Sequence, residues 1–519
     1  MSALIKKIVI VGGGTAGWLT AGILAAEYKN NFAVDIQITL VESPDVSTIG
    51  VGEGTWPSMR ATLRKIGISE ADLITQCFAS FKQGSKFAGW KNGAEADVYH
   101  HPFTIPNGYL ECNVAAAWQA HFAHLPFADV VSVQNYVSEN GCSPKQFTTP
   151  EYAGVVNYGY HLDAGKFGEL LQKHCTSQLG VKHIIDHVTN VVPAPNGDIA
   201  AVNTKEMGGI SGDLFVDCTG FACLLLGQHY GIPFIDEKKF SFNDTALAAQ
   251  VPYPDSASPI ASATIATAQS AGWTWDIGLS SRRGVGYVYS SSHISDEQAE
   301  HELRAHIAKS VGAAVAENLS TRKLSIRAGH REQFWHKNCV AVGMAAGFIE
   351  PLEASALALV ELSANMIRDE LPLTHETMAI VARRFNNVFN YRWERIVEFL
   401  KLHYALSERR DTEYWRDMSN PDAIPEQLQQ LLLLWAQRPP YFSDLMQVEE
   451  IFPSASYQYV LYGMGFKSSS HGVVKTSDNL SLGLEKFKDN FDKARKYVNL
   501  LPSNRALIDH IFKHGMSKI

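Results

Sequence analysis

The residues with the clearest chemical meaning in this 519-residue chain are the glycines of Gly12-Gly13-Gly14-Thr15-Ala16-Gly17. They satisfy a GxGxxG pattern between an apolar strand, predicted over residues 7–11, and a helix, predicted over residues 16–28. Glycines here allow a tight turn and a close backbone approach, and the N-terminus of the helix then stabilises a pyrophosphate. The next strand ends at Glu42, which is placed to hydrogen-bond a ribose diol, or is an ordinary strand-end carboxylate. The run predicts a dinucleotide site that suits NAD or FAD.

Two later segments favour FAD. Asp217-Cys218-Thr219-Gly220-Phe221 and Gly343-Met344-Ala345-Ala346-Gly347-Phe348 each follow a short predicted strand. They resemble the returns to the first sheet that complete the dinucleotide site in FAD-dependent oxygenases of the hydroxybenzoate-hydroxylase type. Met344 stands where those enzymes usually carry an acid, so the resemblance implies flavin contact through backbone or apolar packing at that position.

The hexapeptide Gly272-Trp273-Thr274-Trp275-Asp276-Ile277 is the most informative run in the chain. Two tryptophans at i and i+2 share one face of an extended strand, so by itself the run predicts a buried core strand. Taken with Trp18, Gly50-Val51-Gly52-Glu53-Gly54-Thr55 and Pro351-Leu352-Glu353, it resembles the flavin-dependent tryptophan halogenases. The resemblance runs along most of the chain and is vaguer beyond about residue 420. It implies chemistry driven by FADH2, dioxygen and chloride or bromide, with a separate reductase that supplies FADH2.

The resemblance also implies two catalytic side chains. Lys82, within Phe81-Lys82-Gln83-Gly84-Ser85-Lys86-Phe87, would hold hypohalous acid beside one aromatic carbon, as an ammonium donor or as an amine that forms a haloamine. Lys86, expected on the same helical face, is its nearest competitor. Glu353 would orient the halogenating species and accept the proton lost when the arene regains aromaticity. Its structural alternative is a glutamate that stabilises the first turn of the next helix.

The other positions implied by the resemblance fall into three groups. Cofactor contacts are implied at Gly12, Gly14, Thr15, Ala16, Gly17, Glu42, Val51, Val188 and Met344. Halide is implied at Ser355 and Ala356, which replace a Thr-Gly pair. The aromatic substrate is implied to contact His101, Phe103, Trp273, Trp275, His403 and Phe452. The two tryptophans would then separate the substrate from the flavin ring. No metal site is predicted at His100 and His101, because no third ligand has suitable spacing.

The substrate clamp departs from the family. Enzymes that act on free tryptophan hold its backbone with a Tyr-Tyr pair, a glutamate and an asparagine. The comparable positions here are Tyr441-Phe442, then Glu449 and Glu450, and no asparagine falls where one is wanted. Phe452-Pro453 also stands where the family usually has an aromatic pair that includes tryptophan. Gly278 follows the hexapeptide where proline is usual. The sequence therefore predicts an electron-rich indole-type arene and leaves free L-tryptophan open.

Two other functions fit part of the pattern. A flavin monooxygenase that hydroxylates its substrate directly would place the substrate against the flavin and need no halide. A non-catalytic flavoprotein that binds a metabolite or partner would have no use for both Lys82 and Glu353. Turnover with FADH2 and bromide distinguishes a halogenase from either.

The elements that must position these residues indicate an α/β protein. The expected architecture is an FAD-binding dinucleotide fold of the hydroxybenzoate-hydroxylase type, with an interleaved β-sheet substrate region and a C-terminal helical module. Residues 1–353 are expected to form the FAD-binding domain, with the substrate sheet at about 92–155 and 240–330. Residues 354–519 are expected to form a mainly helical module that covers the substrate. The chain is too long for a single hydrophobic core.

The composition argues against several kinds of partner. A net charge of −8, with 46% hydrophobic and 19% charged residues, is typical of a soluble globular protein without a basic footprint for nucleic acid. No apolar run suits a signal peptide or a membrane span. Seven scattered cysteines without a CxxC pair indicate reduced thiols in the cytoplasm. The apolar run at residues 431–435 suits a buried helix face or a homodimer contact.

Overall fold

The computed structural model describes residues 4–29, 35–45, 52–469 and 480–518. Its first part is a six-stranded sheet, parallel except for one edge strand, whose central strands are apolar and almost fully buried, as their unbroken hydrophobic runs predict. In spatial order its strands are β20 (Trp335–His336), β21 (Cys339–Ala341), β12 (Leu214–Asp217), β1 (Lys7–Val11), β2 (Gln37–Glu42) and β8 (Lys182–Ile185).

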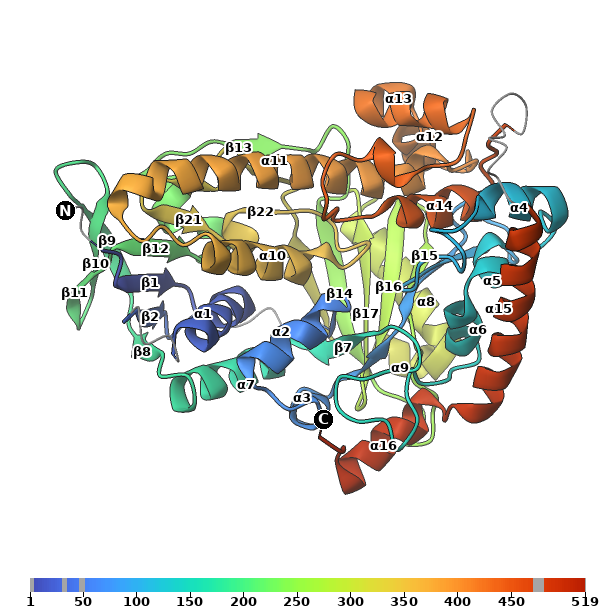
Figure 1. The fold of residues 1–519 in the computed structure, drawn as a ribbon, viewed down its shortest axis with the longest axis horizontal. Helices are drawn as coiled ribbons and strands as arrows, with labels where there is room; N and C mark the ends of the chain where they lie inside the picture. Colours follow the sequence, from blue (N-terminus) through green and yellow to red (C-terminus); the bar gives the residue numbers. More distant parts are fainter. Residues whose placement is uncertain (1–3, 30–34, 46–51, 470–479, 519) are drawn as a thin grey trace.

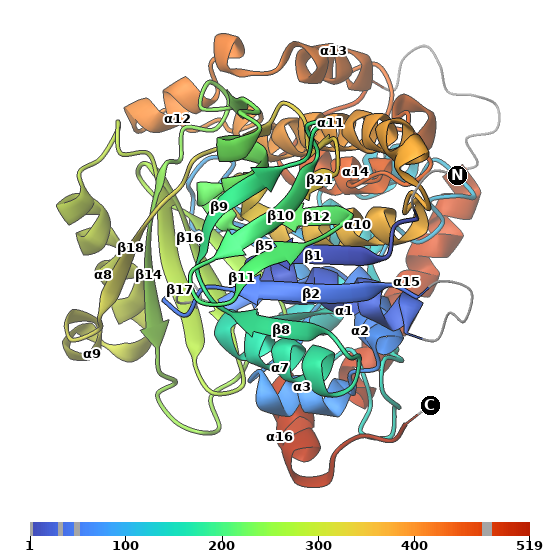
Figure 2. The ribbon, with the colours of Figure 1, turned by 90° about the vertical axis from the view of Figure 1, so that its left-hand side faces the viewer.

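Helices cover one face of this sheet. Helix α1 (Thr15–Tyr28) packs against α7 (Ala164–Ser177) and α10 (Ser355–Asp369), and its residues 17–25 are all buried. A helix that is apolar on every side needs such a position between layers. A three-stranded meander of β9 (Val188–Pro193), β10 (Ile199–Thr204) and β11 (Gly208–Ser211) lies in front of β12 and β1 in Figure 2.

A seven-stranded sheet forms the second part, and the tryptophan hexapeptide is one of its central strands, as predicted. Neighbouring strands are antiparallel except for one parallel pair, β15 with β5. The spatial order is β18 (Thr321–Ser325), β14 (Thr245–Val251), β17 (Arg283–Tyr289), β16 (Gly272–Gly278), β15 (Thr264–Ala268), β5 (Gly84–Ala88) and β6 (Val98–Pro102). Helices α8 (Asp296–Val311) and α9 (Ala313–Glu317) pack on β14 and β17.

Two small sheets join these parts. One contains β3 (Gly52–Gly54), β7 (Gly159–Asp163) and β4 (Ser80–Lys82), with β7 in the centre. The other contains β13 (Phe234–Asp236), β19 (Gly329–Arg331) and β22 (Gly347–Phe348). The chain therefore passes from a small sheet, in which Lys82 ends β4, directly into the seven-stranded sheet, in which β5 begins at Gly84.

Two secondary-structure predictions were wrong. The segment that carries Lys82 and Lys86 is not helical: Lys82 ends β4, Lys86 lies in β5, and Gly84 between them has φ 153°. Its strands are fixed by pairing with distant partners, which a local pattern does not contain. In the segment 92–155 only β6 joins the large sheet. The rest contains α4 (Val114–His121), α5 (Phe127–Val131) and α6 (Val133–Glu139).

The later chain is helical in its described ranges. Helix α11 (His375–Ala405) is 31 residues long and runs from the side of the first sheet toward α12 (Glu413–Met418) (Figure 1). The remaining helices are α2 (Ser58–Ile66), α3 (Glu70–Gln76), α13 (Glu426–Trp435), α14 (Ser454–Gly463), α15 (Leu480–Leu500) and α16 (Asn504–His514). Among the described helices, none is both long and apolar enough to cross a membrane.

Candidate functional site

A cavity of ≈460 Å³ lies at the carboxyl ends of the strands of the first sheet. Seven of the predicted cofactor residues line it: Gly12, Gly14, Thr15, Ala16, Glu42, Val188 and Met344. Gly17 lies behind the glycine turn instead, where a Cβ atom would come within 1.9 Å of the Gly12 carbonyl oxygen. Val51 falls outside the described residues. Gly12 and Gly14 of the motif therefore line the cavity, and Gly17 allows the helix to pack closely against the turn.

The cavity suits a dinucleotide. Helix α1 begins after Gly14 with no side-chain cap and no acidic residue in its first turn, so its first amides are available to a pyrophosphate. Glu42 lines the cavity, and its Oε2 lies 2.9 Å from His183 Nε2, a partner that the sequence pattern did not indicate. A Cβ at Gly13 would lie 2.1 Å from the Glu42 carboxyl carbon, which explains the glycine between Gly12 and Gly14.

Gly12→Ala is expected to abolish FAD binding and to destabilise the fold by about 2–4 kcal/mol. Gly12 has φ 115°, and an added Cβ would lie 2.2 Å from the Cys218 carbonyl oxygen. Thermal unfolding and FAD titration measure the two effects. Gly14→Ala is the matched control for the melting temperature, because a Cβ there meets no protein atom within 4 Å and the backbone is extended. Equal melting temperatures for the two variants would contradict the prediction.

Lys82 is buried at the end of β4, with 1% of its surface exposed. Its Nζ lies 5.3 Å from the centre of the Phe103 ring and close to Gly54, where a Cβ would be 3.0 Å away. Burial lowers the pKa of Lys82 to about 8, although the charge of Glu353 favours the ammonium form. Lys86 lies apart, because its Nζ forms a 2.6 Å ion pair with Glu139.

Glu353 is the centre of a buried polar cluster. Its Oε1 lies 2.9 Å from His101 Nδ1 and 3.4 Å from His403 Nε2, and its Oε2 accepts a 3.3 Å hydrogen bond from Ser85. Burial raises the pKa of the carboxyl, but the two imidazoles act more strongly together and hold it well below its usual range. The helix that follows begins at Ser355, after Ala354 in a left-handed conformation. The Glu353 carboxylate therefore contacts side chains that come from distant elements of the chain.

Both imidazoles are held at their second nitrogen as well. His101 Nε2 lies 2.9 Å from the Ser456 hydroxyl, and His403 Nδ1 lies 2.6 Å from the Tyr99 hydroxyl. Since a carboxylate can only accept, the geometry places a proton on His101 Nδ1. His100 projects from the other side of β6, with Nε2 3.0 Å from Glu139. Ser456 and Tyr99 do not belong to a motif with a known role, so only their position in the structure identifies them as part of this cluster.

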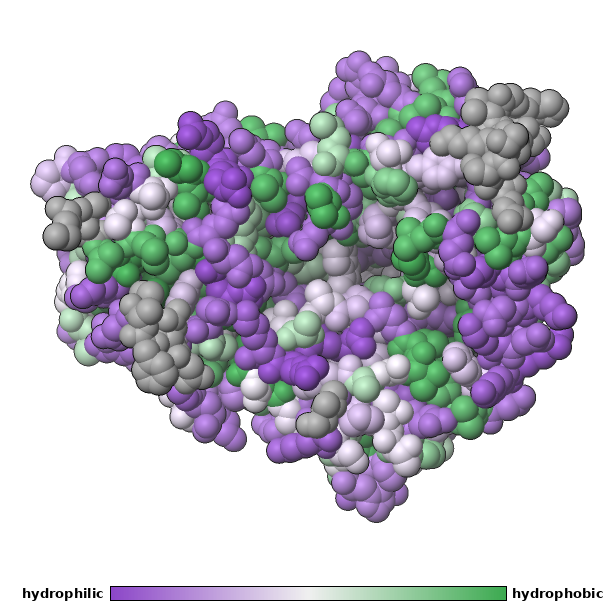
Figure 3. Space-filling view, in the orientation of Figure 1, coloured by the Kyte–Doolittle hydropathy of each residue, from purple (hydrophilic) through white to green (hydrophobic). Residues whose placement is uncertain are grey.

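The remaining predicted pocket residues surround this cluster. Phe452 stacks on Phe399 at 3.9 Å between ring centres and also contacts Trp56. The Trp56 indole donates a 2.8 Å hydrogen bond to the backbone oxygen of Glu353. Ser355 lies two residues beyond Glu353 and lines the cofactor cavity with Ala356. Figure 3 shows this face of the molecule hollowed near its centre, in the region between α10 and α14 of Figure 1.

The two tryptophans of β16 pack against each other in the core, with ring centres 6.4 Å apart. Trp273 Nε1 donates a 2.7 Å hydrogen bond to Glu350, a second buried glutamate on the same loop as Glu353. Neither tryptophan lines the cofactor cavity. Their role as a partition stays a prediction, and what the structure adds is the link from Trp273 to the loop that carries Glu353.

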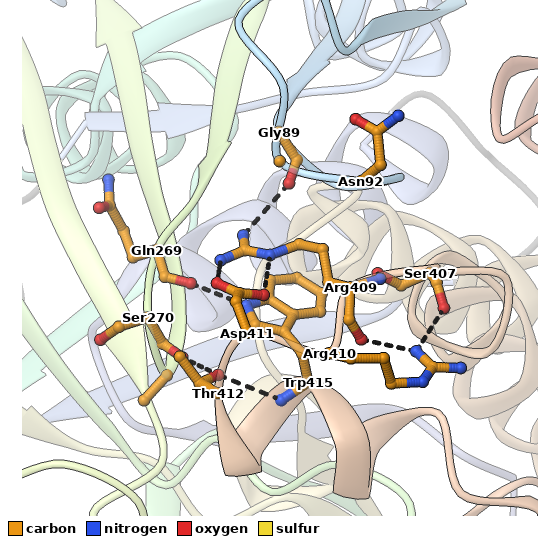
Figure 4. Close-up of polar contacts among 12 residues, drawn as sticks. Gly89, Asn92, Gln269, Ser270, Ser407, Arg409, Arg410, Asp411, Thr412 and Trp415 are labelled. Atoms are coloured by element: carbon orange, nitrogen blue, oxygen red, sulfur yellow. Dashed lines mark hydrogen bonds and ion pairs between the residues drawn. The ribbon is translucent and has the colours of Figure 1, made fainter.

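The segment after α11 anchors the turn that precedes the tryptophans (Figure 4). Thr412 donates a 2.7 Å hydrogen bond to the Ser270 carbonyl, and Trp415 Nε1 donates one of 2.8 Å to that of Gln269. The Arg409 guanidinium lies over the Trp415 ring at 4.4 Å and reaches the Gly89 carbonyl at 3.2 Å. The helical segments thus fix the strands on which Lys82 and the tryptophans depend.

Together these features define a class: an FAD-binding fold of the hydroxylase type whose cofactor cavity adjoins a separate buried lysine–glutamate–histidine cluster. The family model for tryptophan halogenase matches residues 7–478, and the chain belongs to that family. The predicted family and fold are confirmed.

Three comparisons illustrate the relationship. The tryptophan 6-halogenase SttH of Streptomyces toxytricini is 32% identical, covering 96% of each chain. The crystal structure of a tryptophan halogenase from Shewanella frigidimarina NCIMB 400 superposes with a TM-score of 0.95 at 48% identity, covering 99% of each chain. BrvH, a flavin-dependent halogenase from Brevundimonas sp. BAL3, gives a TM-score of 0.86 at 29% identity, covering 98% of this chain and 99% of BrvH. This chain is a flavin-dependent halogenase, an enzyme that uses FADH2, dioxygen and halide.

Proposed function

We propose that this enzyme halogenates an electron-rich, indole-type arene at Lys82 and Glu353. Bound FADH2, with dioxygen and chloride or bromide, supplies hypohalous acid. Lys82 holds and polarises that oxidant beside the ring of the substrate, and its buried position excludes water from the reacting atoms. Glu353 orients the oxidant and takes the proton from the substituted ring carbon. Ser355 and Ala356 bind halide at the start of α10.

One observation carries the proposal: Lys82 and Glu353 are buried together, while Ser355, two residues after Glu353, borders the cofactor cavity. The loop from Glu353 to Ser355 therefore links the cavity, where the oxidant would form, to the cluster. The low pKa of the Glu353 carboxyl keeps it ionised, and its hydrogen bonds with His101 and Ser85 fix its direction. A hydroxylase that places its substrate against the flavin would not need this second buried cluster.

The substrate class rests on the clamp region. Glu450 Oε1 accepts hydrogen bonds from the Tyr391 hydroxyl and from the Gln447 amide, both at 2.7 Å. Phe442 is 75% exposed, so its ring is not packed against a buried pocket in this conformation. Of the residues that would hold an amino-acid backbone, Glu450 thus already accepts hydrogen bonds within the protein, and Phe442 is exposed to solvent. We propose an indole without a free amino-acid group as the preferred substrate.

Product masses test this function. The enzyme is incubated with a flavin reductase, FAD, NADH and either halide against indole, substituted indoles and L-tryptophan. We expect a mass increase of one halogen in place of one hydrogen on indoles, with turnover on indole at least about tenfold above that on L-tryptophan. Hydroxylated product without halide dependence would contradict the halogenase assignment, whereas preference for L-tryptophan would contradict only the substrate class.

Four further features belong to this proposal. A separate reductase supplies FADH2, as the family resemblance implies. A homodimer would use α13, whose Leu428, Leu431 and Trp435 are buried while Leu433 is 71% exposed. The enzyme works in the cytoplasm, which suits the reduced thiols that its seven scattered cysteines predict. Residues 1–353 provide the flavin and sheet elements, and residues 354–519 cover the substrate.

A further inference from the structure

Glu53 lies on the strand that separates the cofactor cavity from Lys82. Its side chain lines the cavity, whereas the next residue, Gly54, faces the other way, toward Lys82 Nζ. Successive residues of a strand point to opposite faces, so β3 presents one residue to each side. Pairing of Glu53 with Leu162 and of Gly54 with His161 on β7 fixes this arrangement.

The Glu53 carboxyl is short of partners. Its Oε2 is shielded from solvent and has no hydrogen-bond partner within the described parts of the chain. A buried polar atom without a partner is costly, and this one borders a cavity suited to a ligand. Burial, with the negative charge of Asp163, raises the pKa of Glu53 to about 7. Glu53 therefore carries its proton under mildly acidic conditions and loses it as the pH rises through about 7.

The charged side chains near Glu53 do not form an ion pair with its carboxyl group. Asp163 on β7 is already paired with Arg282, at 2.7 Å, and also caps α7. Lys82 of β4 lies on the opposite side of β3. The other titratable side chains of the cavity are Glu42 of β2, Asp186 and His187 of the connection between β8 and β9, and Cys218, which follows β12. No described cation is therefore ion-paired with the Glu53 carboxylate.

We propose that Glu53 is the protonated hydrogen-bond donor through which the cavity recognises reduced FAD. Reduced flavin is held largely as an anion at neutral pH, so a carboxylic acid that donates to it favours binding, and an ionised carboxylate repels it. Halide at Ser355 and Ala356, which border the same cavity, would be repelled in the same way. This inference rests on the proposed function for its cofactor and extends it to a residue with no role in the steps above.

Anaerobic titration of the apoenzyme with photoreduced FAD tests the inference. For the wild type we expect the Kd to rise about 30-fold between about pH 6 and about pH 8.5, because only the protonated fraction binds. Glu53→Gln keeps a donor but cannot ionise, so its Kd is expected to change less than about threefold. Glu361→Gln is the matched control: burial raises the pKa of Glu361 to about 7 as well, yet it bonds to Ser58 and is not in the cavity lining.

A flat wild-type profile, or an unchanged pH dependence in Glu53→Gln, would overturn the inference. A folded Glu53→Gln variant is verified by its melting temperature. If it does not fold, infrared spectra of the wild type decide: a protonated-carboxyl band that persists at about pH 7.5 with reduced FAD bound supports the inference, and loss of the band contradicts it. The readouts do not use halogenation, so failure of the proposed function leaves them interpretable.

Discussion

Lys82→Met is expected to lower the halogenation rate by about 10³-fold or more while FAD binding stays within about twofold of the wild type. Methionine has nearly the length of lysine and suits a site with 1% exposure, so the variant removes the amine without leaving an unpaired buried charge. Glu353 keeps its contacts with His101 and Ser85 in the variant. Single-turnover product formation and FAD titration measure the two quantities.

Lys86→Met is the matched control. Lys86 lies four residues away and is paired with Glu139 at a partly exposed position, so its loss is expected to change the rate by less than about threefold. Halogenation by Lys82→Met above about a tenth of the wild-type rate, with FAD bound, would remove Lys82 from the mechanism. The opposite ranking of the two variants would assign the role to Lys86.

The pH profile separates the two chemical roles of Lys82. Its pKa of about 8 means that the ammonium dominates below that pH and the free amine above it. If Lys82 acts as an ammonium donor, the rate falls as the pH rises through about 8. If it reacts as an amine, the rate rises through the same range. The Glu53 effect on FAD binding is removed by saturating the enzyme with FADH2.

Glu353→Gln is expected to lower the rate by about 10²-fold to 10³-fold, because the amide is a far weaker base than the carboxylate. The variant also removes the negative charge that raises the pKa of Lys82. The pH profile assigned to Lys82 is therefore expected to move to lower pH. Rate constants across about pH 6 to 9 at saturating FADH2 give both effects in one experiment.

Glu361→Gln serves as the control for this substitution, since it also neutralises a buried glutamate but lies on α10 against Ser58 and Thr62. We expect it to retain the wild-type rate and profile. A Glu353→Gln enzyme with a normal rate would mean that another group takes the proton. A slow enzyme with an unshifted profile would mean that the titrating group is not Lys82.

Local patterns predicted much of this fold. The β1–α1–β2 unit, the strand of the tryptophan hexapeptide and the long C-terminal helices follow from apolar periodicity and from glycine positions, which act over a few residues. The segment at residues 80–88 was wrongly predicted as helix, because short strands are decided by partners elsewhere in the chain. Placing Lys82 and Lys86 on one face was the direct consequence.

The cofactor class, the family and the two side chains proposed for the chemistry could be predicted from the sequence alone, since each belongs to a short motif with its own spacing. The surroundings of Glu353, in contrast, are known only from the folded chain. Its partners come from β5, β6 and α11, and are up to 268 residues away in the chain. Hydrogen bonds and desolvation depend on distance in space, so the ionisation of Glu353, Lys82 and Glu53 could not be predicted from their neighbours in sequence.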